Sequence, residues 1–400
     1  MSPPPAASPI AAPAEGAVPR ARALRLPLDP LLTLAAIGLG ICSLVALRAA
    51  TQHLIAGQPR YYVDRQAVYL VVGLGLMLAL SRIDYSRLRH IAYGIYAALL
   101  LSILAVLVLG HSANGAQRAI NFPLFSFQAS EIGKVLLILS LSALVVARGR
   151  QLREVPTAMC VIAAAALPAL LVIVQPDLGS GMVYMVIAFT LLFVAGTSWR
   201  QLAVIVALVL AAATFALVVA PAAGVHVLKP FQEERLTAFL HPSSNPEKQG
   251  YQQEESKVAI GAGQKTGRGE SSTQTKLNFV PEDHTDFIFA AVGEQYGFVG
   301  ASLVLSLYAL LIWRTLRILT MAKDLFGTLV AGGVVAMLMF QVFVNVGMAV
   351  GIMPITGVTL PLMSYGGSSV ITTLLAVGLL QSIYVRAGAS QAPRNSVFRY

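Results

Sequence analysis

Charged side chains are scarce in this sequence: Asp, Glu, Lys and Arg make up 12% of its 400 residues, against about 25% in an average soluble protein. Apolar residues reach 56% of the chain, and the mean hydropathy is +0.73. So few charges cannot cover so much apolar surface in water. The composition therefore excludes a soluble protein and predicts one that crosses a membrane many times.

Cysteine and histidine are also rare. The two cysteines, Cys42 and Cys160, both lie inside apolar runs, which excludes a disulfide framework and indicates core positions. The six histidines show no HExxH or similar spacing, so they carry no zinc-protease motif.

Ten apolar runs predict an all-α polytopic membrane protein with ten transmembrane helices. The second, fourth and eighth runs are shorter than the roughly 20 residues that a span needs. Each reaches that length only if it extends into a flank that carries Gln66, Lys134 or Glu294. Polar residues at that depth are expected where a helix lines a polar cavity. The runs cover residues 30–47, 67–80, 91–110, 135–147, 158–174, 181–196, 202–223, 298–313, 325–350 and 368–385.

The segments between and beyond these runs predict one membrane domain with two tails. The first thirty residues hold eight of the 21 prolines and no hydrophobic block, so residues 1–29 are expected to form a disordered cytoplasmic tail. We expect no cleavable signal, because the first span acts as an uncleaved anchor. The membrane domain occupies 30–387, with a large extracytoplasmic loop at 224–285 between the seventh and eighth spans. Residues 388–400 form a cytoplasmic C-terminal tail.

The distribution of Lys and Arg predicts the orientation. Ten spans place both termini on one side, where the tails and short loops carry sixteen basic residues, against five in the short segments opposite. Basic residues are retained on the cytoplasmic side, and long loops do not count toward this rule. Both termini are therefore predicted to be cytoplasmic. The net charge of +10 is a topology signal, and we expect no nucleic acid partner.

A first polar cluster opens the fourth span at residues 128–134. Ser130 is predicted to cap the helix, and Glu131 and Lys134 stand at i and i+3, close enough to pair. One interpretation is a structural ion pair at the interface. The other, which we favour because the span must include Lys134, is a cavity-facing pair that binds a polar substrate.

A second cluster precedes the eighth span and contains three carboxylates and a histidine at positions 282–286. Thr285 is predicted to cap the helix, which places Asp286 in its first turn, where the helix dipole keeps a carboxylate ionised. Such a group suits a base that acts on a substrate hydroxyl. Helix capping would explain the presence of one acidic residue here. It does not explain Asp286 followed by Glu294, which would lie two turns later on roughly the same face of the helix.

A third cluster is uncharged and rich in glycine, proline and serine. It runs from Asn345 through 354–357 to 360–369 and predicts a re-entrant or tightly turned segment, which is tolerated only under protein or in a water-filled cavity. Residues 175–179 are similar but shorter, and a turn with a helix cap explains them at least as well as a functional site.

Together, residues 128–134, 175–179, 250–294 and 354–369 resemble the motifs of the shape, elongation, division and sporulation (SEDS) family, whose members RodA and FtsW polymerise peptidoglycan. The motifs follow the family's order along nearly the whole membrane region. Residues 228–236 and 256–261 resemble the RodA-like branch more than FtsW. The chain departs from the pattern at Ala119, where the family usually has tryptophan, and this bears on how the third loop packs over the cavity.

The resemblance implies that the substrate is lipid II, an undecaprenyl-pyrophosphate disaccharide-pentapeptide, and that the reaction extends a glycan strand for cell elongation and rod shape. Asp286 would act as the catalytic base, and Lys134, Arg118 and Arg65 would stabilise the departing pyrophosphate. A divalent cation, Mg²⁺ or Mn²⁺, would assist, with Glu131 or Asp286 as candidate ligands. The further substrate-binding candidates are Gln128, Ser130, Glu131, Glu282, His284, Ser364, Gly366 and Ser368.

The resemblance also implies a class B penicillin-binding protein as partner, and a site that faces outward from the bacterial cytoplasmic (inner) membrane. Two alternatives stay open: a lipid II flippase, and a weakly active scaffold that activates the transpeptidase. A flippase needs a polar pathway across the whole bilayer, whereas the ionisable residues cluster at the outer ends of the predicted spans.

Overall fold

The structure is a computed structural model and describes residues 28–52, 54–55, 57–113, 116–121, 126–149, 154–215, 249–275 and 284–391. Most of both predicted tails and part of the predicted loop 224–285 lie outside these residues.

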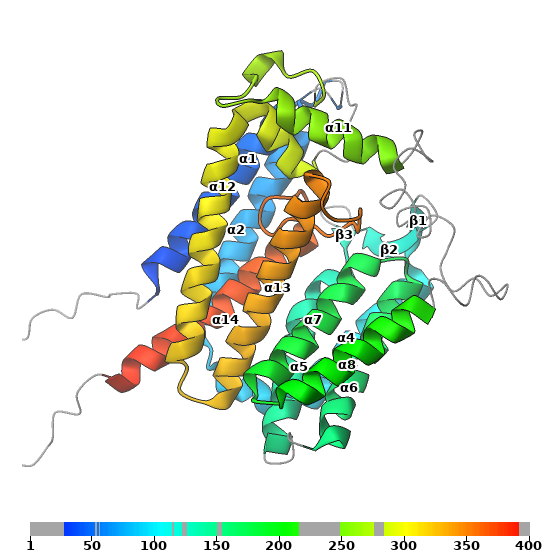
Figure 1. The fold of residues 1–400 in the computed structure, drawn as a ribbon. Coiled ribbons are helices and arrows are strands. Elements are labelled where there is room, and N and C mark those ends of the chain that lie inside the picture. The colour runs from blue at the N-terminus through cyan, green and yellow to red at the C-terminus, as the bar shows by residue number, and fades with distance from the viewer. Residues whose placement is uncertain are drawn as a thin grey trace, which may run out of the picture.

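Apolar helices make up most of the described chain (Figure 1). Among the described residues, eight helical stretches are long and apolar enough to cross a membrane, and two shorter apolar helices accompany them. The protein is therefore a mostly helical, polytopic membrane protein. The eight are α1 (Pro30–Thr51), α2 (Tyr61–Arg82), the run of α3 (Tyr85–Leu88), η1 (Arg89–Ile91) and α4 (Ala92–Leu109), α5 (Ala129–Arg148), α6 (Val155–Val174), α12 (Ile288–Met321), α13 (Leu325–Ala349) and α14 (Gly367–Gln391); the shorter two are α7 (Leu178–Val194) and α8 (Trp199–Thr214).

The helices predicted to extend into polar flanks do so. Gln66, Lys134 and Glu294 lie inside α2, α5 and α12, and their exposed fractions are 0%, 1% and 0%. Polar side chains that are buried this completely need partners inside the protein. These three helices therefore face other protein elements, and not lipid, where the polar residues lie.

Short strands and a short helix accompany the spans. A three-stranded antiparallel sheet, in the order β1-β2-β3, precedes α5, so the prediction of an all-α chain is wrong at this segment. The polar segment between α4 and α5 has no apolar helical repeat, and strand pairing satisfies its backbone instead. Helix α11 occupies part of the long predicted loop, with η5 (Gly269–Ser271) after it. The bounds are β1 (His111–Ala113), β2 (Ala116–Asn121), β3 (Ser126–Phe127) and α11 (Gln249–Ala262).

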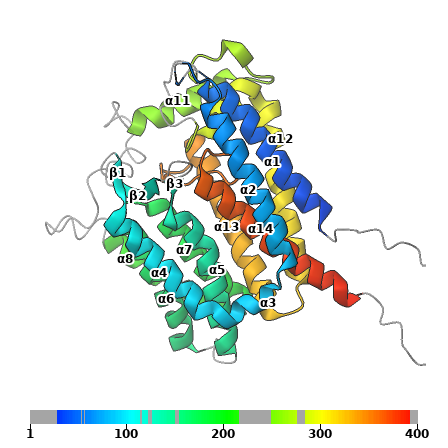
Figure 2. The same ribbon diagram turned by 180° about the vertical axis from the view of Figure 1, so that it is seen from behind.

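The helices form two neighbouring groups (Figures 1 and 2). One group contains α1, α2, α12, α13 and α14, the other contains α4 to α8, and α13 packs against α5 and α7 between them. Helix α1 begins and α14 ends at the same end of the bundle, here called the tail end. At that end the backbone N–H of Asp29 donates to Oε1 of Gln381 at 2.7 Å. The opposite end, where α11 and the strands lie, is called the loop end.

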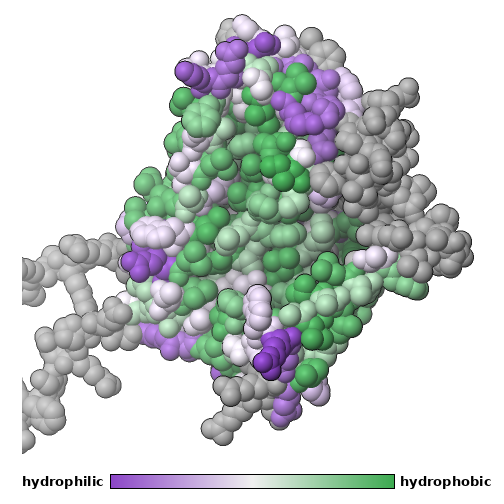
Figure 3. Space-filling model, viewed as in Figure 1, coloured by the Kyte–Doolittle hydropathy of each residue, from purple (hydrophilic) through white to green (hydrophobic). Residues whose placement is uncertain are grey.

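Apolar side chains cover most of the middle of the molecular face in Figure 3, and hydrophilic residues gather toward its ends. Large apolar side chains elsewhere on the helices are also exposed, such as Leu101 at 65% and Val108 at 76%. Exposed apolar surface of this extent marks a membrane-facing protein.

Candidate functional site at the loop end

The start of α5 holds a buried ion pair at the loop end. Nζ of Lys134 lies 2.6 Å from Oε1 of Glu131, and the two residues are 1% and 4% exposed. The predicted pairing is confirmed. Two charges removed this far from water are tolerated only because they neutralise each other.

Ser130 does not cap α5, so that prediction is wrong. The N-cap is Gln128, which makes no side-chain capping bond. Ser130 lies one residue inside the helix, and its hydroxyl donates to Oδ2 of Asp177 at 2.8 Å. The amide of Gln128 donates to the same oxygen at 3.2 Å. The Ser130 hydroxyl, which local spacing predicted to cap α5, therefore binds Asp177 at the start of α7 instead.

Asp177 is a residue that sequence reasoning left undecided between turn and site. Its other oxygen, Oδ1, accepts from the backbone N–H of Ser180 and caps α7, so the interpretation as a helix cap is confirmed, and the functional interpretation stays a prediction. Helix α7 also approaches α5 closely at Gly133, which has no side chain. A Cβ added there would lie 2.0 Å from the Tyr184 hydroxyl. That hydroxyl donates to the carbonyl of Ser130 at 3.1 Å.

Residues 350–366, here called the linking segment, join α13 to α14 without regular structure, and all but one of them are buried or half-buried. The predicted irregular segment under protein cover is confirmed. Its polar groups find partners across the loop end: Gln66 donates to the carbonyl of Ser364 at 3.2 Å and accepts from the N–H of Gly366 at 3.3 Å. Just beyond the segment, Ser368 accepts from the N–H of Gln128 at 3.0 Å and donates to the carbonyl of Ser126 at 2.8 Å.

The linking segment also reaches the buried ion pair. The hydroxyl of Thr359 lies 3.5 Å from Oε1 of Glu131 and 3.0 Å from the hydroxyl of Ser369. A contact of 3.5 Å is a weak hydrogen bond, but it is the point where the segment and the pair meet. Sequence reasoning did not select Thr359, because a lone threonine in an uncharged loop carries no signal of its own.

Asp286 precedes α12 and does not belong to its first turn, so both the predicted cap and the predicted position are wrong. Helix α12 begins at Ile288, with Phe287 as its N-cap and no side-chain capping bond. The side chain of Thr285 therefore does not cap the helix. The reason lies in three long-range hydrogen bonds that hold the chain in a turn immediately before the helix.

Those three bonds, here called the carbonyl clamp, occupy three consecutive carbonyl oxygens. The backbone N–H of Tyr365 donates to His284 O at 2.9 Å, and the hydroxyl of Ser364 donates to Thr285 O at 2.6 Å. The side-chain amide of Asn345 donates to Asp286 O at 2.8 Å. The backbone under the half-buried Asp286 is thus fixed by α13 and by the linking segment.

The spacing predicted that Asp286 and Glu294 share roughly one face of a helix, but Asp286 precedes α12, and Glu294 lies within it. Its carboxylate accepts the backbone N–H groups of Thr273, Gln274 and Thr275 at 2.8–2.9 Å. It also binds the Thr275 hydroxyl. Glu294 therefore anchors the chain that follows α11 to α12, a structural role.

Aromatic rings surround the first turn of α2 at the loop end. The guanidinium carbon of Arg65 lies 4.4 Å from the ring centre of Tyr61, a cation–π distance. The ring of Tyr62 lies 5.0 Å from the rings of both His284 and Tyr365. Burial raises the pKa of the Tyr365 phenol well above its usual range, so it is protonated at neutral pH. These ring contacts place Arg65 and His284 in the same region as the carbonyl clamp.

Two predicted site residues remain unplaced. Glu282 lies outside the described residues, and Arg118 lies on β2 while its side chain is outside the described part. Within the described residues, no group of three His, Cys, Asp or Glu side chains could hold a metal ion. Glu131 is a poor cation ligand in this arrangement because the Lys134 ammonium takes its Oε1.

Comparisons with known proteins cover nearly the whole membrane region. The sequence model of the FtsW/RodA/SpoVE family, described as "Cell cycle protein", matches residues 28–388. The chain is 35% identical over 363 residues to "Peptidoglycan glycosyltransferase MrdB" of Escherichia coli strain K12, with 89% of this chain and 93% of that protein covered. It is 37% identical over 365 residues to "Probable peptidoglycan glycosyltransferase FtsW" of Thioalkalivibrio sulfidiphilus, with 88% and 87% covered.

Solved structures share the fold. A chain from a peptidoglycan synthase complex, described as coordinating polymerization and crosslinking, has a TM-score of 0.76 and 33% identity, and the match covers 90% of this chain and 99% of that one. The rod shape determining protein RodA of Thermus thermophilus has a TM-score of 0.62 and 31% identity, with 90% and 97% covered.

Proposed function

The chain belongs to the FtsW/RodA/SpoVE family of cell cycle proteins, and from that membership we propose that it is a peptidoglycan glycosyltransferase that polymerises lipid II into glycan strands. In this reaction a sugar hydroxyl of one substrate attacks the anomeric carbon of another. The bond to undecaprenyl pyrophosphate breaks, and the hydroxyl proton leaves to a base. The site must therefore hold a base near the acceptor and positive charge near the leaving group.

The carbonyl clamp is the observation that carries this proposal. A base must be held in position relative to the groups that act on the leaving group. The clamp fixes the backbone of Asp286, and its donors lie in or beside the linking segment. Through Thr359 the same segment meets the Glu131–Lys134 pair. We assign Asp286 as the base on this ground.

Lys134, Arg65 and Arg118 are the cations that we propose for the departing pyrophosphate. Lys134 is neutralised by Glu131, so the pair would open toward the substrate when the pyrophosphate arrives. Gln128 and Ser130 would keep α5 in position through Asp177, and His284, Ser364, Gly366 and Ser368 would shape the acceptor side. Glu282 belongs to the same proposal.

A divalent cation fits this site at Asp286 better than at Glu131. Mg²⁺ is usually held by one or two carboxylates together with substrate phosphates and water, which matches one carboxylate facing a pyrophosphate. Bound there, Mg²⁺ or Mn²⁺ would neutralise charge on the leaving group. Asp286 could then serve as base or as ligand, and the two roles respond differently to metal concentration.

We further propose that α7 and α8 also span the bilayer, which gives ten spans, and that the loop end faces outward from the bacterial cytoplasmic membrane. Lipid II headgroups would then meet Asp286 from the outer leaflet. The motif at 256–261 favours a RodA-like role in elongation. A class B penicillin-binding protein is the proposed partner, because a structural relative belongs to a synthase complex for polymerization and crosslinking.

The test is polymerisation of labelled lipid II by purified protein that carries Asp286→Asn. Asparagine keeps the size of the side chain but loses its basicity, so the rate should fall by about 10²–10⁴-fold, the usual contribution of a general base. Asp64→Asn is the matched control, because Asp64 is an exposed acid at the same end of the bundle. It should polymerise at close to the wild-type rate.

Each outcome decides between the roles. If raising Mg²⁺ restores much of the Asp286→Asn activity, Asp286 is a ligand and not the base. If the variant polymerises normally without added metal, both roles are wrong. If the wild type makes no polymer with its partner present, the proposed activity fails. Lipid scrambling in liposomes would then identify a flippase, and stimulation of the transpeptidase alone would identify a scaffold.

A further inference from the structure

A cavity of about 380 Å³ lies between α4, α5 and α6, toward the tail end and away from the proposed catalytic site. Its volume falls in the range of small-molecule pockets. Helices α4 and α6 are peripheral, and much of their surface is exposed apolar side chain, such as Leu170 at 60%. The cavity therefore opens on the part of the protein that lipid surrounds.

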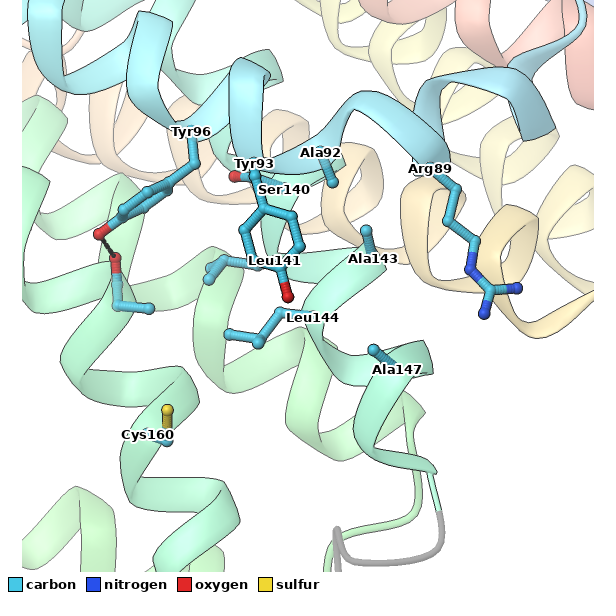
Figure 4. A pocket seen from close by; sticks show the side chains of 11 residues that line it. Arg89, Ala92, Tyr93, Tyr96, Ser140, Leu141, Ala143, Leu144, Ala147 and Cys160 are labelled. Atoms are coloured by element: carbon cyan, nitrogen blue, oxygen red, sulfur yellow. Dashed lines mark hydrogen bonds between the residues drawn. The ribbon is translucent and has the colours of Figure 1, made fainter.

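Small side chains create the hollow, and larger ones form its walls (Figure 4). Ala143 and Ala147 of α5 and Ala164 of α6 line it. Leu141 and Leu144 form part of the apolar wall. An aliphatic chain would bury apolar surface here without leaving a polar group unpaired.

One end of the cavity is polar and basic. Arg89 lies at that end in Figure 4 and is exposed. Among the described lining residues it is the only charged one. The nearby acid Asp84 does not neutralise it, because Asp84 is paired with Arg386 at 2.9 Å. An apolar hollow that ends in a cation with no ion pair among the described residues matches a molecule with an aliphatic tail and an anionic head.

We propose that this cavity binds an anionic glycerophospholipid, with an acyl chain between α4, α5 and α6 and the phosphate on Arg89. Basic pockets between membrane helices on the cytoplasmic side bind anionic headgroups, and the tail end is the side that carries most of the basic residues. This site is separate from the proposed polymerase site; it rests on the proposed orientation, in which the tail end is cytoplasmic, and not on the proposed activity.

A second cavity provides a contrast within the same chain. It measures about 450 Å³, lies between α1 and α12, and is lined by apolar and uncharged polar side chains with no charged residue among the described ones. None of its described lining residues is a cation that would select an anionic head. A preference for anionic lipid should therefore depend on the cavity at Arg89.

The test measures retention of phosphatidylglycerol and phosphatidylcholine by the purified full chain, by native mass spectrometry. Arg89→Gln should lower the preference for phosphatidylglycerol about fivefold, the value of one basic residue at an anionic surface. Ala147→Phe should reduce retention of both lipids, because the ring fills the hollow. Arg87→Gln is the matched control: Arg87 is an exposed arginine two residues away that does not line the cavity.

Several results would overturn the site. Equal loss in Arg87→Gln and Arg89→Gln would mean general attraction to a basic surface. Unchanged retention in Ala147→Phe, in a protein with wild-type thermal stability, would mean that no chain enters the cavity. Competition by glycerophosphoglycerol, which has the head but no tails, would mean that a free phosphate site exists there instead of a lipid site.

Discussion

The Glu131–Lys134 pair places two full charges where almost no water reaches. Neutral, well-packed side chains of the same size would often be as stable as such a pair or more so. Its presence at the start of α5 therefore favours a functional role over a purely structural one. A stability measurement alone cannot separate these roles, because removing one partner leaves the other charge buried and unpaired.

A double variant separates them. Glu131→Gln and Lys134→Met should each lower the free energy of unfolding by about 3–5 kcal/mol, because each strands one charge. The combined variant should regain most of that stability and still polymerise little lipid II, since neither charge remains to act on the pyrophosphate. Thermal unfolding and polymerisation of the three purified variants measure this. A double variant with near-normal activity would assign the pair a purely structural role.

At the scale of elements, the linking segment decides how the loop end is assembled. The segment is mostly buried or half-buried, and its hydrogen bonds join several helices to it. Ser43 of α1 donates to Met363 O, and Gln66 of α2 binds Ser364 and Gly366. Asn345 at the end of α13 joins this assembly through Val358 O and Asp286 O, both at 2.8 Å. It is a positioning residue for Asp286.

Asn345→Leu should remove both donors and leave two buried carbonyls unpaired, at a cost of about 1–3 kcal/mol each. We expect kcat for polymerisation to fall far more than lipid II affinity, because the turn that holds Asp286 loosens. Gln381→Leu is the matched control. Gln381 is another fully buried amide, which donates to Asp29 O and Thr33 at the tail end. It should lower stability and leave kcat unchanged; an equal fall in kcat in both variants would contradict a positioning role for Asn345.

At the scale of the whole molecule, the start of α1 and the end of α14 lie at one end of the bundle, and the candidate site lies at the other. The Asp29–Gln381 contact joins the start of α1 to α14 at the tail end. The acid of that contact is also paired with Arg314 of α12. The proposed site lies at the loop end, so the proposed orientation puts the substrate on the side of the membrane opposite to the start of α1 and the end of α14.

Reporter fusions test this arrangement. A reporter placed after Arg386 should be cytoplasmic, and one inserted near Lys248, which lies outside the described residues, should be external, because most basic residues outside the long loop lie at the tail end. Alkaline phosphatase and green fluorescent protein fusions in the same vector provide opposite signals for each position. A cytoplasmic signal from the Lys248 insertion would reverse the orientation and remove access to lipid II from outside.

Hydropathy and helix length are local properties, so the amino-acid sequence was sufficient to predict the helical membrane architecture. It located the apolar runs that became helices, and it required α2, α5 and α12 to include Gln66, Lys134 and Glu294. It also located the Glu131–Lys134 pair, since the two residues are neighbours on one helix face. The short strands β1, β2 and β3 were not predicted, because they have no apolar repeat.

Only the tertiary structure decided what the polar groups bind. Ser130 takes an acceptor 47 residues away and not its own helix end. The carboxylate of Glu294 accepts backbone N–H groups about 20 residues before it, whereas the spacing had placed it on one helix face with Asp286. Asp286 stays outside α12 because Asn345, 59 residues later, holds its carbonyl. Capping rules weigh only neighbours in sequence, whereas a buried polar group takes whichever partner the packed helices bring within hydrogen-bonding distance.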